Sequence, residues 1–349
     1  MAGGARGIVT GGTWCVDRNK LVEYWPGEDG LVRILAVEQA GGGSACNCGI
    51  DLRRLDPTLP VATIGLVGDD ADGRFLLAEA DAAGIERTRM QVTDAAPTQY
   101  TDAFCSARTG RRTHIYFEGT AALLTPAHFD FSTLGGRIFH LGLPGVHRLM
   151  DARRQDAANG WVVTLCAAQA AGFLTSLELA SIAPARLAEL VRPCLPHLDY
   201  LIVNDTEIGA LADEATVAAG HTDIAACARA VRRVAAAGRF RLVAAHFPEG
   251  VVALAADGAL LCAPSLAVPP SAIAGANGAG DAFAAGTLYG LHEAWSVPEA
   301  LALGRAAAAA SLRGVSTTGA VVAWRDCLAL AAEWGERAAF PASAFAPDA

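Results

Sequence analysis

Apolar residues of this chain gather in short runs that are separated by stretches with helical spacing. Runs that predict strands lie at residues 8–16, 61–67, 138–143, 161–166, 200–203 and 241–245. Patterns that predict helices lie at about residues 146–158, 174–191, 205–213 and 221–237. Apolar strands that alternate with helices are typical of a parallel sheet with helices on both faces. The pattern therefore predicts an α/β fold with a central, mostly parallel sheet.

Capping residues and turns mark the remaining elements. We expect a helix at 45–55 with Ser44 as its cap, and a second helix between the turn at 68–73 and Gly84. A hairpin is expected around Asp257-Gly258, and alanine-rich helices at 297–313 and 324–339. Asp17 follows the first predicted strand directly. Side chains at strand ends are candidate ligand-binding groups, because ligands of parallel sheets bind at the carboxyl ends of the strands.

Two segments alternate between polar and apolar residues and contain turn signals. The first, residues 18–38, holds the turns Pro26-Gly27 and Asp29-Gly30, and the second, residues 97–118, is a predicted hairpin around Thr109-Gly110. Together they predict a small separate sheet. The expected organisation is a core made of 8–17, 39–96 and 119–340, the small sheet at 18–38 and 97–118, and a loose tail at 341–349.

Composition restricts the class of protein. The chain has 349 residues, 52% of them hydrophobic and 18% charged, which is enough apolar material for a large core. Its net charge of −9 and the lack of a basic stripe argue against nucleic acid or an acidic membrane as partners. The start of the sequence has no signal-peptide pattern, and the nine cysteines are odd in number and mostly apolar in context. We therefore expect a cytoplasmic protein with reduced thiols and no membrane segment.

Two common nucleotide-binding loops are missing. Lys20 is the only lysine and Leu21 follows it, so the Gly-Lys-Ser/Thr of a Walker A loop cannot occur. The glycines at 275, 278 and 280 have the wrong spacing for the dinucleotide-binding fingerprint. No second Cys/His pair accompanies Cys46 and Cys48, so a zinc site there is not supported.

The most informative stretch is 277–283, with the sequence NGAGDAF. Gly278 and Gly280 flank Ala279, and an apolar helical run starts at Ala282. A small-residue loop that enters a helix binds anions through free N–H groups and the helix dipole. A carboxylate at the same place, Asp281, suits an acid that performs chemistry beside a phosphate.

Four motifs in order resemble the PfkB, or ribokinase-like, carbohydrate kinase family over about residues 8–322. Gly42-Gly43 followed by Asn47 is similar to its G-G-x-x-x-N signature, and 65–73 resembles its G-x-V-G-x-D-x-x-G segment. Residues 204–207 resemble its N-x-x-E motif, and 278–281 its G-A-G-D signature. The resemblance implies a three-layer α/β/α sandwich with a small β-sheet lid formed by 18–38 and 97–118.

The resemblance also implies roles for individual residues. Asp281 would be the general base, with the backbone N–H groups of Gly278, Ala279 and Gly280 as the anion hole. Glu207 would hold Mg²⁺ through water as well as helping to bind the nucleotide. The acceptor would be bound by Asp17, Gly42, Gly43 and Asn47, and ATP by Asn204, Glu207, Gly250 and Asn277.

Two departures from the family pattern concern the nucleotide side. Gly275 and Ala276 stand where the family usually has Asp-Thr, which leaves a monovalent-cation site without its usual acidic ligand. Ala245 and Phe247 stand where a T-x-G-x-x-G nucleotide turn is usual. We therefore expect little dependence on potassium and altered nucleotide contacts.

Several residues keep two interpretations at this stage. Glu207 is a metal-organising residue or an exposed helix charge, Asn47 an acceptor ligand or a cap, and Asp17 an acceptor ligand or a strand end. His140 is a ligand or a core histidine. The aromatic residues of the small sheet either stack on the substrate, fill the sheet as apolar packing or form a dimer surface. Its arginines either lie at a solvated hairpin tip or bind an anionic group of the substrate. These residues are Tyr100, Phe104 and Tyr116, and Arg108, Arg111 and Arg112.

The sequence thus predicts an ATP- and Mg²⁺-dependent kinase that phosphorylates a hydroxyl of a sugar or nucleoside. A non-catalytic sugar or nucleotide sensor with the same fold is the alternative from another class. A hydroxymethylpyrimidine- or pyridoxal-type kinase ranks lower, because the G-G…N segment is present. Ribose-like sugars, hexoses, keto-deoxy acids and nucleosides all remain open as acceptors. A homodimer through the small sheet is expected because exposed sheet edges and apolar faces need cover.

Overall fold

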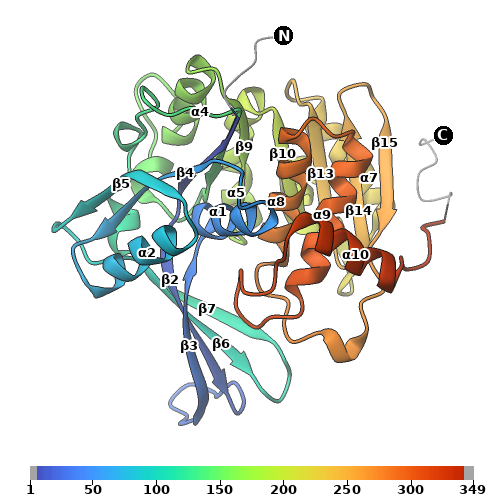
Figure 1. Cartoon of the computed structure of the whole chain (residues 1–349), viewed down its shortest axis with the longest axis horizontal. Helices are drawn as coiled ribbons and strands as arrows, with labels where there is room; N and C mark the ends of the chain where they lie inside the picture. Colours follow the sequence, from blue (N-terminus) through green and yellow to red (C-terminus); the bar gives the residue numbers. More distant parts are fainter. Residues whose placement is uncertain (1–5, 342–349) are drawn as a thin grey trace.

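The computed structural model describes residues 6–341, and a nine-stranded sheet forms its centre (Figure 1). The strands lie in the order β15-β14-β13-β10-β9-β8-β1-β4-β5. Neighbours from β13 to β5 pair in parallel, whereas β14 and β15 are antiparallel, so the predicted mostly parallel sheet is confirmed. The strands are β1 (Ile8–Gly12), β4 (Val61–Gly68), β5 (Glu86–Thr93), β8 (Ile138–Gly142), β9 (Leu174–Leu177), β10 (Tyr200–Asn204), β13 (Leu242–Phe247), β14 (Gly250–Ala255) and β15 (Leu260–Pro264).

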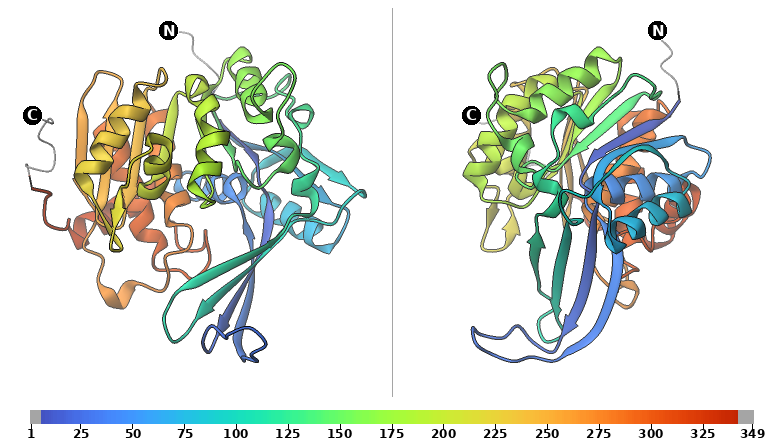
Figure 2. Two further views of the ribbon diagram at one scale, coloured as in Figure 1. Left: turned by 180° about the vertical axis from the view of Figure 1, so that it is seen from behind. Right: turned by 90° about the vertical axis from the view of Figure 1, so that its left-hand side faces the viewer.

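Helices cover both faces of this sheet (Figures 1 and 2). Two separate apolar clusters fill the spaces between the layers, so that in β1 Ile8 packs into one cluster and the next residue, Val9, into the other. The expected three-layer α/β/α sandwich is therefore confirmed. One face carries α1 (Ser44–Leu55), α2 (Ala71–Ala82), α8 (Ala279–His292), α9 (Val297–Ser311) and α10 (Trp324–Trp334), and the other α4 (Gly160–Ala170), α5 (Pro184–Val191), α6 (Asp205–Ala212) and α7 (Ile224–Ala235).

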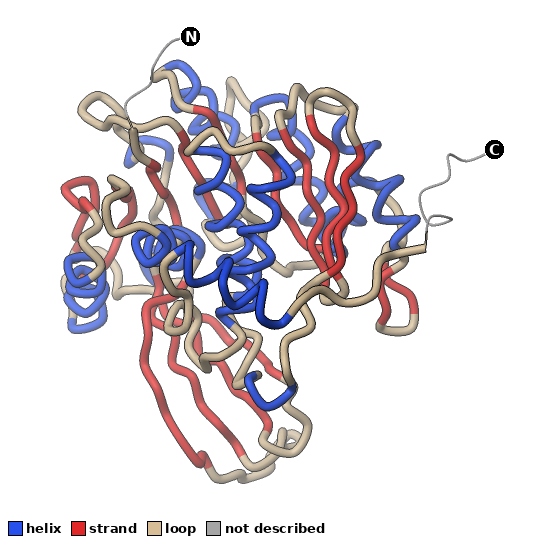
Figure 3. Tube along the Cα trace, turned by 45° about the vertical axis from the view of Figure 1, so that its right-hand side comes forward, coloured by secondary structure: helices blue, strands red, loops and turns tan. Residues whose placement is uncertain are grey.

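A second, four-stranded sheet projects from the core (Figures 2 and 3). It consists of β2 (Cys15–Val22), β3 (Ile34–Gly42), β6 (Tyr100–Ser106) and β7 (Arg112–Phe117), in the order β3-β2-β6-β7. The expected small sheet is thus present. Strands β2 and β3 extend past the boundaries drawn from the sequence, because Asp17 and Gly42 belong to them. We call these four strands the small sheet.

The prediction for the segment 146–191 is partly wrong. Residues 161–166, expected as a strand, belong to α4, whose first turn is capped by Asn159 through a hydrogen bond from the Val162 N–H (3.1 Å). Trp161 and Leu165 are buried at helical spacing, which a continuous apolar run conceals. The helix expected at 146–158 shrinks to α3 (Arg148–Asp151), and the start of the one expected at 174–191 is strand β9.

Two local predictions near the amino terminus are also corrected. The strand expected at 8–16 is interrupted after β1, where Gly12 has a φ of 112°, and Asp17 therefore lies inside β2 and not at a strand end. The cap of α1 is Gly43, while Ser44 is the first helical residue and makes no capping bond. Of the expected tail at 341–349, all but Pro341 lies outside the described residues.

Candidate active site

The amino ends of helices α1, α6 and α8 hold three of the four motifs that the sequence analysis selected, while the fourth, at 65–73, spans the end of β4 and the start of α2. Helix α1 follows Gly42-Gly43, α6 follows β10 directly, and α8 starts at Ala279. Helices α1 and α8 belong to the same layer and pack against each other. Helix amino termini present unpaired N–H groups and a positive dipole end, so this arrangement favours anionic ligands.

Asn47 and Asp281 are far apart in the sequence but in contact in the fold. The Asn47 Nδ2 donates a hydrogen bond of 3.1 Å to Asp281 Oδ2, although 234 positions separate them. Asn47 is buried, and its other polar atom, Oδ1, is also buried without a hydrogen-bond partner among residues 6–341. Asn47 therefore does not cap its own helix, and its contact with Asp281 joins the predicted acceptor-binding and phosphoryl-binding motifs.

The start of α8 has the geometry of an anion-binding loop. Gly278 has a φ of 75°, and a Cβ there would lie 2.1 Å from the Thr317 carbonyl oxygen, so only glycine fits. The first bond of the helix runs from the Ala282 N–H to the Gly278 oxygen (2.9 Å), and no side chain caps this end. The N–H groups of Ala279, Gly280 and Asp281 precede that bond and are available to an anion. The anion hole expected from the N–H groups of Gly278, Ala279 and Gly280 stays a prediction.

Glu178 is a site residue that the sequence analysis missed. It follows β9 directly, and its carboxyl group lies close enough to that of Asp281 to shift the pKa of Asp281. Burial, and then the charge of Glu178, raise the pKa of Asp281 well above its usual value, while the bond from Asn47 acts in the opposite direction. Burial also raises the pKa of Glu178. The negative charge of Glu178 therefore makes ionisation of Asp281 less favourable.

His140 supports Glu178 from the neighbouring strand β8. Its Nε2 lies 2.6 Å from Glu178 Oε2 and its Nδ1 lies 3.1 Å from Ser176 Oγ. Burial lowers the pKa of His140 to about 4, so the imidazole is neutral at pH 7. A neutral ring with both nitrogens occupied orients the Glu178 carboxyl group and does not itself contact the Asn47–Asp281 pair.

The carboxyl group of Asp17 lies against Gly42, one of the two glycines that precede α1. A Cβ on Gly42 would lie 2.3 Å from the carboxyl carbon of Asp17, and a Cβ on Gly43 would lie 2.6 Å from the Thr13 oxygen. Burial raises the pKa of Asp17 to about 6, with a contribution from Asp281 in the same direction and an opposing one from the Cys15 thiol. The glycines therefore allow the half-buried carboxyl group of Asp17 to approach the backbone within electrostatic range of Asp281.

Asn204 and Glu207 cap helix α6 reciprocally. The Asn204 side chain accepts a bond of 2.8 Å from the Glu207 N–H, and Glu207 Oε2 accepts one of 3.0 Å from the Asn204 N–H. Glu207 is only 8% exposed, so it is not a solvated helix charge. Burial raises its pKa to about 7.

The sequence matches one family along most of its length. Residues 7–323 match the family described as pfkB family carbohydrate kinase. The chain belongs to this family. The protein is therefore a phosphotransferase with an alcohol group as acceptor, in agreement with the motif reading.

Known relatives of this pfkB kinase share its fold at low sequence identity. The adenosine kinase of Schizosaccharomyces pombe is 24% identical over 287 residues, which cover 79% of this chain and 80% of the relative. The ribokinase of Thermotoga maritima superposes with a TM-score of 0.75 at 20% identity and covers 93% of this chain and 99% of its own. The nucleoside kinase of Methanocaldococcus jannaschii gives a TM-score of 0.71 at 16% identity, with 95% and 100% covered.

The last two predicted nucleotide residues of the pfkB kinase are less informative. Gly250 begins β14, where a Cβ would lie 2.2 Å from the Ala263 oxygen, so hairpin packing alone requires a glycine. Asn277 lies in the turn before α8 and is half-buried. His246, which the sequence analysis missed, lies closer to the start of α8. Its Cε1 is 3.3 Å from the Cβ position of Gly280, and its ring centroid lies 5.1 Å from that of Phe283 with the two rings tilted by 39°.

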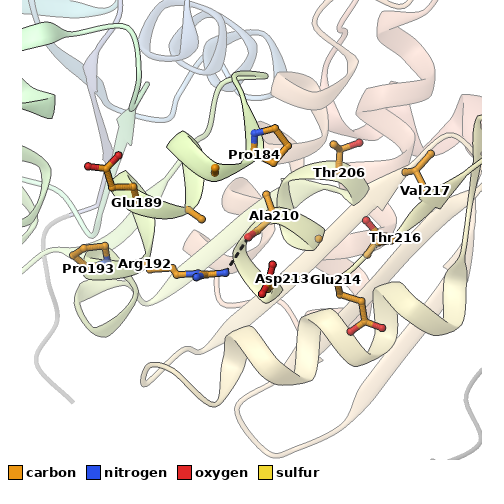
Figure 4. A pocket seen from close by; sticks show the side chains of 14 residues that line it. Pro184, Glu189, Arg192, Pro193, Thr206, Ala210, Asp213, Glu214, Thr216 and Val217 are labelled. Carbon is orange, nitrogen blue, oxygen red and sulfur yellow. Dashed lines mark hydrogen bonds between the residues drawn. The ribbon is translucent and has the colours of Figure 1, made fainter.

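A cavity of about 960 Å³ in the pfkB kinase lies elsewhere, between α5 and α6 (Figure 4). Thr206 and Gly209 line it from α6, and Glu189 and Arg192 from α5 and the turn after it. None of the predicted site residues lines this cavity. Among residues 6–341 no cluster of three or more histidine, cysteine or acidic side chains is arranged to hold a metal ion, and no helix is long and apolar enough to cross a bilayer.

Proposed function

We propose that this pfkB-family kinase transfers the γ-phosphoryl group of ATP to a hydroxyl group of a sugar or nucleoside. The observation that carries the proposal is the position of Asp281. It stands in the first turn of α8, next to free N–H groups, and is hydrogen-bonded to Asn47 of the acceptor-side motif. A single carboxylate is thus in reach of both an acceptor hydroxyl and a bound phosphate.

In the proposed reaction Asp281 removes the proton from the acceptor hydroxyl as its oxygen bonds to the γ-phosphorus. The bond between this phosphorus and the leaving ADP oxygen breaks, and the proton stays on Asp281. The N–H groups of Gly278, Ala279 and Gly280 would stabilise the charge on the phosphoryl oxygens, at about 3–4 kcal/mol for one donor. Proton removal by a positioned base typically contributes about 10²–10⁴-fold.

The acceptor would be held on the other side of Asp281. Asp17 lies against Gly42, and Asn47 lies against Asp281, so their polar atoms line one place from three different elements. Carboxylate and amide groups recognise vicinal hydroxyls by hydrogen bonds. A ribokinase from Arabidopsis thaliana is described in complex with ribose and ATP, and it shares this fold with a TM-score of 0.72 at 19% identity. Ribose-containing acceptors are therefore the first to test.

Magnesium would enter with the nucleotide phosphates. The carboxyl group of Glu207, beside the carboxamide of Asn204, suits an ion held through water rather than a dedicated protein cage. When bound, the ion would neutralise charge on the β- and γ-phosphates. The raised pKa of Glu207 means that a cation nearby would favour its ionised form.

The small sheet supports the proposal of a homodimer. Its outer strands carry large apolar side chains that are exposed in one copy of the chain, among them Val37 at 65% and Ile115 at 55%. Val37 pairs with Lys20 and Ile115 with Asp102, which places both side chains on the face opposite Asp17. Light scattering of the purified protein and of Val37→Glu tests this. A monomer in the wild type removes the proposal. The cytoplasm stays the expected compartment.

An ATP-consumption screen tests the proposed function. The acceptors are ribose-like sugars, nucleosides, hexoses and keto-deoxy acids, and Asp281→Asn serves as the blank. Turnover of one acceptor class above the blank supports the proposal. Binding of a sugar or nucleotide by calorimetry without any turnover would instead support a sensor with the same fold.

A further inference from the structure

His246 lies at the carboxyl end of β13, beside the start of α8. Its Cε1 and Nε2 lie 3.3 and 3.5 Å from the position that a Cβ on Gly280 would take, so the lack of a side chain at Gly280 allows the imidazole to approach the helix closely. The ring also packs against Phe283. The imidazole therefore lies beside the loop whose N–H groups are predicted to bind the transferring phosphoryl group.

The alternation of side chains along β13 directs His246 toward that loop. Ala245 and Phe247 pack into the apolar cluster on the opposite face of the sheet, whereas Ala244 packs into the cluster that includes α8. His246 is on the same face as Ala244. In the parallel pairing of β10 with β13 it is also the partner of Asn204, which belongs to the predicted nucleotide motif. One side chain is thus next to the nucleotide motif and to the anion-binding loop.

The ring nitrogens of His246 are unoccupied, unlike those of the buried histidines. Within residues 6–341 three histidines are buried and have partners within 3.2 Å at both ring nitrogens, namely His140, His147 and His292. His246 is half-buried and makes no hydrogen bond to any residue of that range. Since no protein group fixes its tautomer, the proton of the neutral ring can occupy the nitrogen that faces a ligand.

The protonation state of His246 suits a neutral donor. Burial lowers its pKa to about 4, against an opposing effect of the charge of Asp205, so the free ring carries one N–H at pH 7. The first turn of α8 also holds the acidic Asp281, whose ionised form repels a phosphoryl group. A further donor beside this turn would offset part of that repulsion.

We infer that His246 is a further catalytic residue, which donates its N–H to an oxygen of the transferring phosphoryl group. This inference rests on the proposed kinase function. The imidazole forms no covalent bond in this step, and the proton of the acceptor hydroxyl still passes to Asp281. A donor that is already in place before the transfer stabilises the charge on the phosphoryl oxygens without rearrangement.

Substitutions at position 246 separate the donor from the packing of the ring. His246→Phe keeps an aromatic ring against Phe283 but has no N–H, His246→Leu is a second apolar variant, and His246→Gln keeps a donor. In the two apolar variants kcat should fall at least ~10-fold, because loss of one such donor typically costs ~10²–10³ in kcat. His246→Gln should lose less, and the KM of the acceptor should stay nearly unchanged in all three.

His221 provides the matched control. It is exposed and lies in the short strand β12 (His221–Thr222), so His221→Phe and His221→Gln should match the wild type. If His246 acted by packing alone, His246→Phe would preserve that packing. A kcat of His246→Phe within about twofold of the wild type would therefore overturn the inference.

Calorimetry without an acceptor separates this inference from the proposed function. ATP carries the γ-phosphoryl group and ADP does not, so ATP should bind His246→Phe at least ~10-fold more weakly than the wild type, while ADP should bind both equally. This comparison is decisive even if the acceptor screen finds no turnover, which would count against the proposed function alone. An equal loss of affinity for ATP and ADP, or no loss for either, would overturn the inference.

Discussion

Asn47 Nδ2 and Asp281 Oδ2 lie 3.1 Å apart, and this hydrogen bond ties the helix that follows Gly42-Gly43 to the helix that follows Gly278. The amide stabilises the ionised form of Asp281, while burial and Glu178 stabilise the protonated form. The balance between these neighbours decides at which pH Asp281 can accept a proton. The protonation of Asp281 therefore depends on Asn47 and Glu178 as well as on its own burial.

Replacement of the proposed base gives the first prediction. Asp281→Asn should lower kcat at least ~10²-fold, because an amide cannot accept the hydroxyl proton. ATP affinity, measured by calorimetry, should be retained because the backbone N–H groups remain. Asp257→Asn on the exposed β14–β15 hairpin is the matched control. Near-normal turnover of Asp281→Asn would remove the base assignment.

The carboxyl pair gives a prediction for the pH profile. Because Glu178 raises the pKa of Asp281, activity of the wild type should rise with pH through a value well above that of an ordinary carboxylate. Glu178→Gln removes the negative neighbour, so the acidic limb of kcat/KM should move to lower pH. A pH–rate profile from pH 5 to 9 measures this shift. An unchanged limb would show that Glu178 does not control Asp281.

The contact between Gly42 and Asp17 gives a prediction for acceptor binding. Gly42→Ala would bring a Cβ to 2.3 Å from the Asp17 carboxyl carbon, so the carboxylate must move. The KM of the acceptor should rise at least ~10-fold, with the KM of ATP much less affected. Gly27→Ala in the small sheet's turn is the control, because nothing lies within 4 Å of a Cβ there. A purely structural defect would instead lower the unfolding temperature and alter both KM values.

Potassium should have little effect on activity. Gly275 has no carboxylate to hold a cation, and the guanidinium of Arg112 already lies at that place. Initial rates in potassium chloride and in choline chloride at equal ionic strength should agree within about twofold, since the screening of charges is then the same. Strong activation by potassium would show that other groups form a cation site.

The buried Asp51 gives a prediction for stability. It lies on α1 four residues after Asn47, is completely buried, and neither carboxyl oxygen has a hydrogen-bond partner in the described part of the chain. Burial, and then the charge of Asp281, raise its pKa well above the usual value. A raised pKa means that the folded chain holds the proton more tightly than the unfolded chain. Its contribution to stability is therefore present at low pH and is lost as the pH rises.

Asp51→Asn should remove that dependence. Between pH 5.5 and 8 the free energy of unfolding of the variant should fall less than that of the wild type. The difference should be about 1.4 kcal/mol for each pH unit between 5.5 and the pKa of Asp51 in the folded wild type, up to pH 8. Urea unfolding at the two pH values measures the difference. Asp257→Asn should behave as the wild type, and equal slopes for Asp51→Asn and the wild type would contradict the prediction.

Local patterns made the glycine motifs and most strands predictable. Gly42, Gly278 and Asp281 act through backbone conformation and spacing that the sequence displays directly. Glu178 escaped prediction because β9 has only four residues, and its apolar run was assigned to a helix. The contact of Arg112 with Gly275 could not be foreseen either, since it depends on how the small sheet is placed against α8. The features that were predicted depend on local sequence, whereas the features that were missed depend on how distant segments are placed in the fold.

The place of β1 in the central sheet has a consequence for synthesis of the chain. This first strand pairs on one side with β4 and on the other with β8, and Asp281 follows much later in the sequence. As the chain emerges from the ribosome, β1 must wait for residues 138–142 before its second edge is covered, and Asn47 must wait for its partner on α8. A nascent chain interrupted before α8 therefore contains Asn47 but not yet Asp281.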